Sequence, residues 1–147
     1  MNLVMRWVGI QEVKRRLQTL EPKVRNKCLR KGMRPAIKIM LNRARQLAPK
    51  GKSRTFVAHK GYSPIQHRGG LLKRAIKIVS GRSRKGVRIS VMWKRGADND
   101  AFYGAFVNEG TKKIRAQKFL EQAFRQTARQ VQSTAITSIL QEIESVV

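Results

Sequence analysis

Residues 102–124, FYGAFVNEGTKKIRAQKFLEQAF, decide the fold that this sequence predicts. The aromatic run Phe102–Val107 favours a β-strand, because aromatic and β-branched side chains pack well on a pleated surface. Gly110 follows this run and favours a tight turn at 109–111, since glycine adopts a positive φ at no steric cost. A short basic loop and an amphipathic helix that begins near Gln117 complete a strand–turn–helix corner.

Two helices and a hairpin are predicted upstream of this corner. A helical period begins at Ile10, and a longer one covers Pro22–Ala48, where Gly32 and Pro35 predict a kink or a break. The alternation of apolar and polar residues predicts a hairpin over 74–93 with a basic tip.

The two ends of the chain are also expected to form regular structure. Leu3–Val8 is a short alternating segment and predicts an opening strand. The last helix is expected to run for about 30 residues, which is longer than a small sheet of short strands can cover. Its far end is therefore expected to project or to pack on another subunit.

Together these elements predict an α+β fold in a single domain of residues 1–147. A small, mostly antiparallel sheet is expected to be covered on one side by the Pro22–Ala48 helix, in the N-terminal half, and by the long C-terminal helix. Pro and Gly at both ends of 49–70, and the absence of a period between them, predict a long, mobile, basic loop there.

The charge of the chain is its most unusual property. It has 33 Lys and Arg against 8 Asp and Glu, a formal net charge of +25. Between residues 22 and 95 there are 23 Lys and Arg and no Asp or Glu. A field of this sign attracts polyanions and acidic protein surfaces, so the expected partner is DNA, RNA or an acidic neighbour in an assembly.

Composition also sets the expected compartment. Cys28 is the only cysteine and lies in a helical pattern, which predicts a buried, inert thiol in a reducing or indifferent environment. No stretch approaches the ~18 apolar residues of a membrane span, and the N-terminal residues do not have the pattern of a signal peptide. We therefore expect the cytoplasm, or a particle assembled there, and no membrane partner.

Little in the sequence indicates an enzyme, and we expect no catalytic residues, metal or cofactor. His59 and His67 have no neighbouring acid or cysteine to complete a metal site. Asp98 and Asp100 suit a turn and lack the further oxygen ligands of a calcium loop. The segment 51–53, Gly-Lys-Ser, lacks the preceding strand and upstream glycine of a phosphate-binding loop.

The basic segments are the stronger functional signal. Phe56 and Tyr62 lie among the cations of the 49–70 loop, a combination that suits phosphate contact and base stacking. The alternative is a solvated basic surface with no specific ligand. Lys23, Arg30 and Arg45 are interpreted as an outer polar face of their helix. The candidate contacts with DNA or a partner are Lys50, Lys52, Arg54, Lys60, Arg68, Arg82, Arg84 and Lys85.

The segment YGAFVNEGT…AQKFLEQAF resembles the signature of a family of neck or tail-completion proteins of tailed bacteriophages, the gene-ten-like putative tail components of lambda-like siphophages. Lys118 stands where that family usually has Pro, and a Lys in a first helical turn is expected to change little. Ala48-Pro49 matches a second short segment, although about twenty residues are inserted after it and a following Thr is missing. The matching residues are Glu109, Gly110, Thr111, Ala116, Gln117, Phe119, Leu120 and Ala123.

The resemblance implies a structural virion protein at the head–tail junction, assembled in the cytoplasm of a bacterial host. Such a protein forms or joins a ring of about six or twelve copies between connector and tail tube, through head-to-tail contacts that close. Its positive charge would face duplex DNA in the channel or acidic neighbouring proteins, and Glu109 would anchor the corner by pairing with Arg115 or capping backbone N–H groups. The alternative is a non-specific nucleic-acid-binding protein that is not part of a virion; a nuclease is disfavoured because acids are so few.

Overall fold

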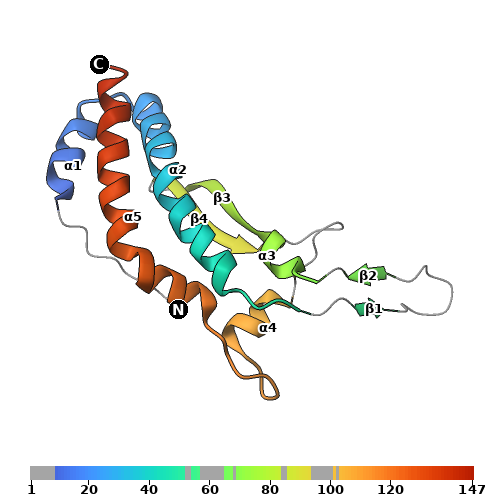
Figure 1. Cartoon of the computed structure of the whole chain (residues 1–147). Helices are drawn as coiled ribbons and strands as arrows, with labels where there is room; N and C mark the ends of the chain where they lie inside the picture. The colour runs from blue at the N-terminus through green and yellow to red at the C-terminus, as the bar shows by residue number, and fades with distance from the viewer. Residues whose placement is uncertain are drawn as a thin grey trace.

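The computed structural model describes residues 9–51, 54–56, 65–67, 69–83, 86–93, 101 and 103–147, with the backbone alone at 54–56, 65–67, 82, 83 and 86. Within these residues the chain is α+β, as predicted (Figure 1). The elements in order are α1 (Ile10–Gln18), α2 (Pro22–Leu47), β1 (Arg54–Phe56), β2 (Ile65–His67), α3 (Leu71–Ala75), β3 (Ile76–Ser83), β4 (Gly86–Trp93), α4 (Gly104–Glu109) and α5 (Phe119–Glu144).

The helices α2 and α5 lie side by side and form the body of the molecule (Figure 1). Their backbones approach closely at Gly32, where a Cβ would lie 2.7 Å from the Cα of Ile139. α2 is one continuous helix through both Gly32 and Pro35, so the predicted break is wrong. Pro35 removes one backbone hydrogen bond, but Gly32 lets α5 pack along the whole helix and hold it together.

The far end of α5 is covered within the chain, by α1 and by the N-terminal half of α2. The expectation that this end projects or needs another subunit is therefore wrong. Pro22 opens α2, as its tolerance in a first turn predicts, and α1 folds back because its apolar stripe has a partner in α5. The buried residues of this three-helix end are Val13, Leu17, Cys28, Ala36, Val131, Ala135, Ile139 and Ile143.

The predicted hairpin is confirmed as β3 and β4, which pair antiparallel from Ile76↔Trp93 to Ser83↔Gly86. Residues 74 and 75 belong instead to the short helix α3. α2 lies between this hairpin and most of α5 (Figure 1), and the start of α5 reaches the sheet where Phe119 packs against Trp93. The sheet thus packs against both long helices, as predicted. Arg45, predicted to lie on an outer polar face, donates from Nε and Nη2 to the Ile76 carbonyl oxygen at 3.1 and 2.8 Å and ties α2 to β3.

The 49–70 segment contains regular structure that the sequence did not reveal. β1 and β2 pair antiparallel, with Arg54 opposite His67 and Phe56 opposite Ile65. Strands of three residues are too short to produce a visible alternation, which explains the missed prediction. This small hairpin extends away from the helices (Figure 1).

The strand predicted at Phe102–Val107 is wrong, because residues Gly104–Glu109 form the helix α4. Tyr103 and Val107 pack against the core, and Gly104 and Asn108 are buried, which is the i, i+4 spacing of a helix face. The aromatic composition favoured a strand, but the periodicity fits a helix. The opening strand predicted at 3–8 lies outside the described residues.

A second core lies at the sheet end of the molecule. Phe119 is 1% exposed, and its ring centroid lies 6.4 Å from that of Trp93. Cys28, in the other core, is also 1% exposed, as predicted. Among the described residues, no helix is long and apolar enough to cross a membrane. The buried residues of the sheet end are Leu41, Ala44, Ala48, Leu72, Ala75, Ile76, Ala101, Phe119 and Ala123.

Candidate functional site: a fixed corner and a basic groove

Gly110 turns the chain between α4 and α5 with φ 80° and ψ 176°, which confirms the predicted positive φ. A Cβ at this position would lie 2.7 Å from the backbone nitrogen of Ala116 and 2.9 Å from the carbonyl oxygen of Ile114. Both the backbone angle and the lack of space therefore require glycine.

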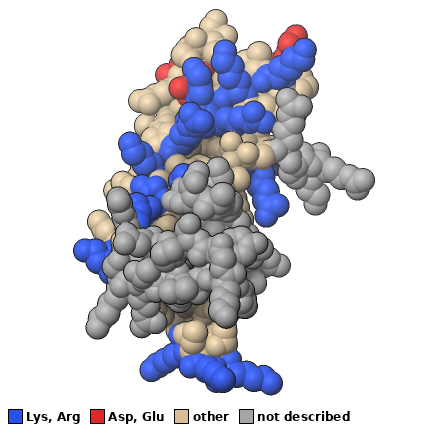
Figure 2. All heavy atoms as spheres, turned by 90° about the vertical axis from the view of Figure 1, so that its right-hand side faces the viewer, with Lys and Arg blue, Asp and Glu red and all other residues tan. Residues whose placement is uncertain are grey.

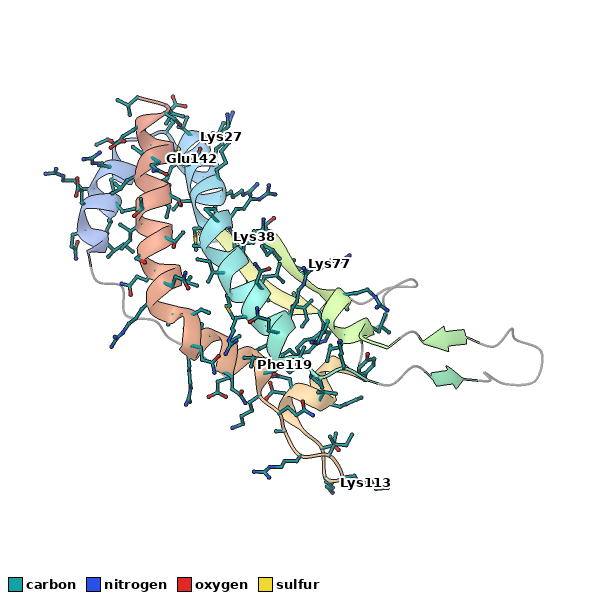
Figure 3. The ribbon with its side chains drawn as sticks, in the orientation of Figure 1. Lys27, Lys38, Lys77, Lys113, Phe119 and Glu142 are labelled. Atoms are coloured by element: carbon teal, nitrogen blue, oxygen red, sulfur yellow. The ribbon has the colours of Figure 1, made fainter. Side chains whose placement is uncertain are left out.

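The loop that follows Gly110 is closed by its own hydrogen bonds. The Thr111 N–H donates to the Ile114 carbonyl at 2.8 Å, and the Thr111 hydroxyl accepts from the backbone N–H groups of Lys113 and Ile114 at 3.2 and 3.1 Å. The N–H groups of Gln117 and Lys118 donate to the carbonyls of residues 107 and 108, both at 3.0 Å. The loop is thus attached to α4 at its base and leaves Lys113 at its tip (Figure 3).

Asn108 is the residue at this corner that the sequence did not single out. Its side chain is buried, with the residue 6% exposed. Its Oδ1 accepts from the backbone N–H of Leu120 at 3.2 Å, and its Nδ2 donates to Glu109 Oε1 at 2.6 Å. Asn108 therefore caps α5 from twelve residues upstream, a distance at which no local capping pattern exists to be recognised. Among the described residues Glu109 bonds this side-chain amide, and neither predicted alternative, an ion pair with Arg115 or a cap on backbone N–H groups, is found.

Lys118 precedes α5 with φ 46° and ψ 35°, in the left-handed region. Proline is fixed near φ −65° and does not adopt this conformation. The expectation that Lys or Pro would serve equally here is wrong, because position 118 is the N-cap and not the first helical turn. Phe119 and Ala123 are buried, and Leu120 packs against the same core. These residues form the inner face of the predicted amphipathic helix.

A groove of about 1160 Å³ lies between the N-terminal half of α2 and the β3–β4 hairpin. One wall is a stripe of cations at helical spacing over fifteen residues, roughly 22 Å of helix at 1.5 Å per residue. Figure 2 shows Lys and Arg gathered on this face, and Figure 3 shows Lys27 and Lys38 along α2. The lining residues are Lys23, Asn26, Lys27, Arg30, Lys31, Arg34, Pro35, Lys38, Ile78, Ser80 and Ile89.

The positive charge of this groove is largely uncompensated. Lys31 Nζ lies 3.4 Å from Glu142 Oε2, but the other five cations form no ion pair within the described part of the chain. The Nε of Arg30 is buried and has no hydrogen-bond partner there. Cations this close together repel one another, so an anionic ligand in the groove would lower the free energy of the folded chain.

Lys23 and Arg30, predicted to form a merely polar outer face, thus line the groove. The sequence did contain the signal, because Lys23, Lys27, Arg30, Arg34 and Lys38 recur at intervals of three or four residues with no acid among them. What it did not contain was the position of the hairpin that forms the opposite wall.

Most of the contacts predicted from the sequence have no described side chain. Lys50 is exposed just beyond α2. Arg54 begins β1 and Arg82 lies near the end of β3, both with only the backbone described. The predicted contacts outside the described residues are Lys52, Lys60, Arg68, Arg84 and Lys85.

His59, Asp98 and Asp100 lie outside the described residues, and His67 is described only as backbone in β2. Among the residues that are described, no three His, Cys, Asp or Glu side chains are grouped so that they could hold a metal ion.

Comparison with known proteins adds no relative. No protein-family model, no curated protein and no solved structure matches this chain.

Proposed function

We propose that this chain is a structural protein of the head–tail junction of a tailed bacteriophage, which forms or joins a ring between connector and tail tube. The proposal rests on the residues that resemble the signature of neck and tail-completion proteins. Its partners would be further copies of itself and the adjacent connector and tail proteins. It would be assembled in the cytoplasm of the bacterial host and remain in the virion.

The observation that carries the proposal is that the signature residues from Glu109 onward meet at one corner, although the helix α4 stands where the family typically has an aromatic-rich strand. Gly110 is required by space and φ, Thr111 closes the loop, the Gln117 N–H bonds α4, and Phe119 fills the sheet-end core. Residues of one motif that meet in one hydrogen-bonded unit are consistent with a shared structural role.

The corner also offers a surface for another subunit. Phe106, on α4, and Ile114, in the loop, are each 48% exposed. Val79 and Met92 are exposed on the hairpin face that is turned away from α2. Exposed apolar side chains such as these four are suited to contact between neighbouring proteins.

A second candidate function is non-specific binding of nucleic acid outside a virion. The five groove cations that form no ion pair within the described residues, and the net charge of +25, favour it, because phosphate contacts supply most of such affinity. Neither candidate requires a cofactor.

The mass of the purified chain in solution distinguishes a ring protein of the head–tail junction from a non-specific nucleic-acid-binding protein. Light scattering at low and high salt, with and without duplex DNA, should detect a closed ring of about six or twelve copies without DNA if the proposal is right. A monomer that binds DNA with a steep salt dependence favours the second candidate. A monomer that does neither should be co-expressed with the products of adjacent genes, and failure to form a complex with any of them would contradict the proposal.

A further inference from the structure

The floor of the groove is apolar although its wall is basic. Ser80 pairs with Ile89 and Ile78 with Val91, and side chains directly opposite each other lie on the same face of a hairpin. Ile78 and Val91 pack against the sheet-end core beneath α2. The same face continues to Ser80 and Ile89, and Ile78, Ser80 and Ile89 together line the groove.

The wall and the floor suit different parts of one ligand. The cations of the wall would pair with any anion, including the phosphates of a duplex. Phosphates gain nothing from an isoleucine floor, and no aromatic side chain among the described residues lines the groove to stack a base. A protein segment that carries both carboxylates and aliphatic side chains uses both surfaces.

We propose that this groove binds an acidic, aliphatic segment of a partner protein. Its carboxylates pair with Lys27, Arg30, Arg34 and Lys38, and its aliphatic side chains lie on Ile78 and Ile89. The proposed binding concerns only the chemistry of the partner segment. It does not require ring formation, and it therefore does not depend on whether the chain belongs to a virion.

Fluorescence anisotropy with synthetic probes tests the proposal. The main probe is a labelled peptide of alternating Glu and Leu; the comparison probes are a peptide of the same length and charge with Ser in place of Leu, and a duplex DNA. At physiological salt we expect the Glu/Leu peptide to bind at least about tenfold more tightly than the Glu/Ser peptide. Equal affinities, or no binding of the Glu/Leu peptide, would overturn the proposal.

A matched pair of variants locates the binding. R34E/K38E reverses two exposed charges in the groove, and K112E/K113E reverses two exposed charges in the 111–118 loop, so the net charge changes equally. We expect R34E/K38E to weaken Glu/Leu peptide binding about tenfold or more and K112E/K113E to weaken it about twofold or less. Circular dichroism of both variants checks that the fold is retained.

Other occupants of the groove have distinct outcomes. Equal weakening by the two variants would show that net charge alone attracts the peptide. Tighter binding of duplex DNA, lost in R34E/K38E, would identify a nucleic-acid site. Oligomers of the wild-type chain that R34E/K38E dissociates would identify a second copy as the occupant. Each of these results would overturn the proposal.

Discussion

The two ends of the α2–α5 pair are held together in different ways. At the three-helix end, α1, α2 and α5 bury an aliphatic cluster with Cys28 and Ile139 among its members. At the sheet end, Phe119 and Trp93 pack beside a loop that Asn108 and Gly110 fix through hydrogen bonds and close backbone contact.

The three-helix end therefore depends on the spacing of apolar residues, and the sheet end depends on the identity of particular residues. Any set of apolar residues at helical spacing and suitable volume could form the three-helix end. The sheet end requires particular residues, because a capping amide and a glycine with positive φ have no equivalent replacements. Substitutions at the two ends should therefore differ in how well conservative replacements are tolerated.

The largest expected effect is that of Phe119→Ala, which empties the centre of the sheet-end core. We expect a loss of about 3–5 kcal/mol in the free energy of unfolding, since a buried aromatic ring is replaced by a cavity. Urea denaturation measures it. Ile139→Val, at the other end, should cost only about 0.5–1.5 kcal/mol. A loss below about 1 kcal/mol for Phe119→Ala would contradict the conclusion that the Phe119 ring fills the centre of the sheet-end core.

Two glycines allow a sharper test of the two ends. Gly32→Ala places a Cβ 2.7 Å from the Ile139 Cα, and Gly110→Ala combines a similar clash with a positive φ. We expect each to cost about 1–3 kcal/mol in urea denaturation, with Gly110→Ala the more severe.

Gly51 provides the control, because a Cβ there meets no atom of the described residues within 4 Å. Gly51→Ala should leave the unfolding midpoint nearly unchanged. If Gly110→Ala behaves like Gly51→Ala, the corner is not fixed in the way described.

Asn108 tests whether the cap stabilises α5. Asn108→Ala removes the acceptor for the Leu120 N–H and should cost about 1–2 kcal/mol by urea denaturation. Asn108→Asp keeps an acceptor but loses the donor to Glu109 and places two carboxylates together. An Asn108→Ala variant as stable as the wild type would exclude a capping role.

The smallest expected effect concerns alkaline pH. Burial raises the pKa of Tyr103 above its ordinary value near 10, although a hydrogen bond from the Leu72 backbone and the charge of Arg74 oppose this. A raised folded-state pKa means that the folded chain holds the phenol proton more tightly than the unfolded chain. The stability from this proton is complete below about pH 10 and is lost as pH rises through the unfolded pKa towards the folded one.

Tyr103→Phe removes this titration. Denaturation of wild type and variant at about pH 9 and 11 should therefore show a smaller loss of stability in Tyr103→Phe. Parallel losses in the two proteins would show that Tyr103 contributes nothing to the pH dependence.

Periodicity predicted the elements that many residues specify. α1, α2 and α5 follow the helical period of their apolar residues, and the hairpin follows the alternation of apolar and polar residues, which is clearest at 87–91 in β4. α4 was mistaken for a strand because six residues contain too few turns for the period to outweigh aromatic composition.

The candidate site was predicted only where one residue decides the local backbone. Gly110 was found from its identity. The Asn108 cap and the basic groove were not, because each depends on segments distant in sequence that packing brings together. The cations of α2 were visible as a stripe, but their function as a wall depends on the hairpin opposite.

The buried thiol of Cys28 has a practical consequence for kinetics. Its Sγ lies 3.7 Å from the carbonyl oxygen of Glu142, so a thiol reagent reaches it only when α2 and α5 separate at this end. Because the sequence contains no other cysteine, the labelling rate of the unmodified protein measures the frequency of that opening alone. Amide hydrogen exchange at Gln117 and Lys118 reports the opening of the other end. The two rates, measured on one sample, would show whether the ends of this molecule open together or independently.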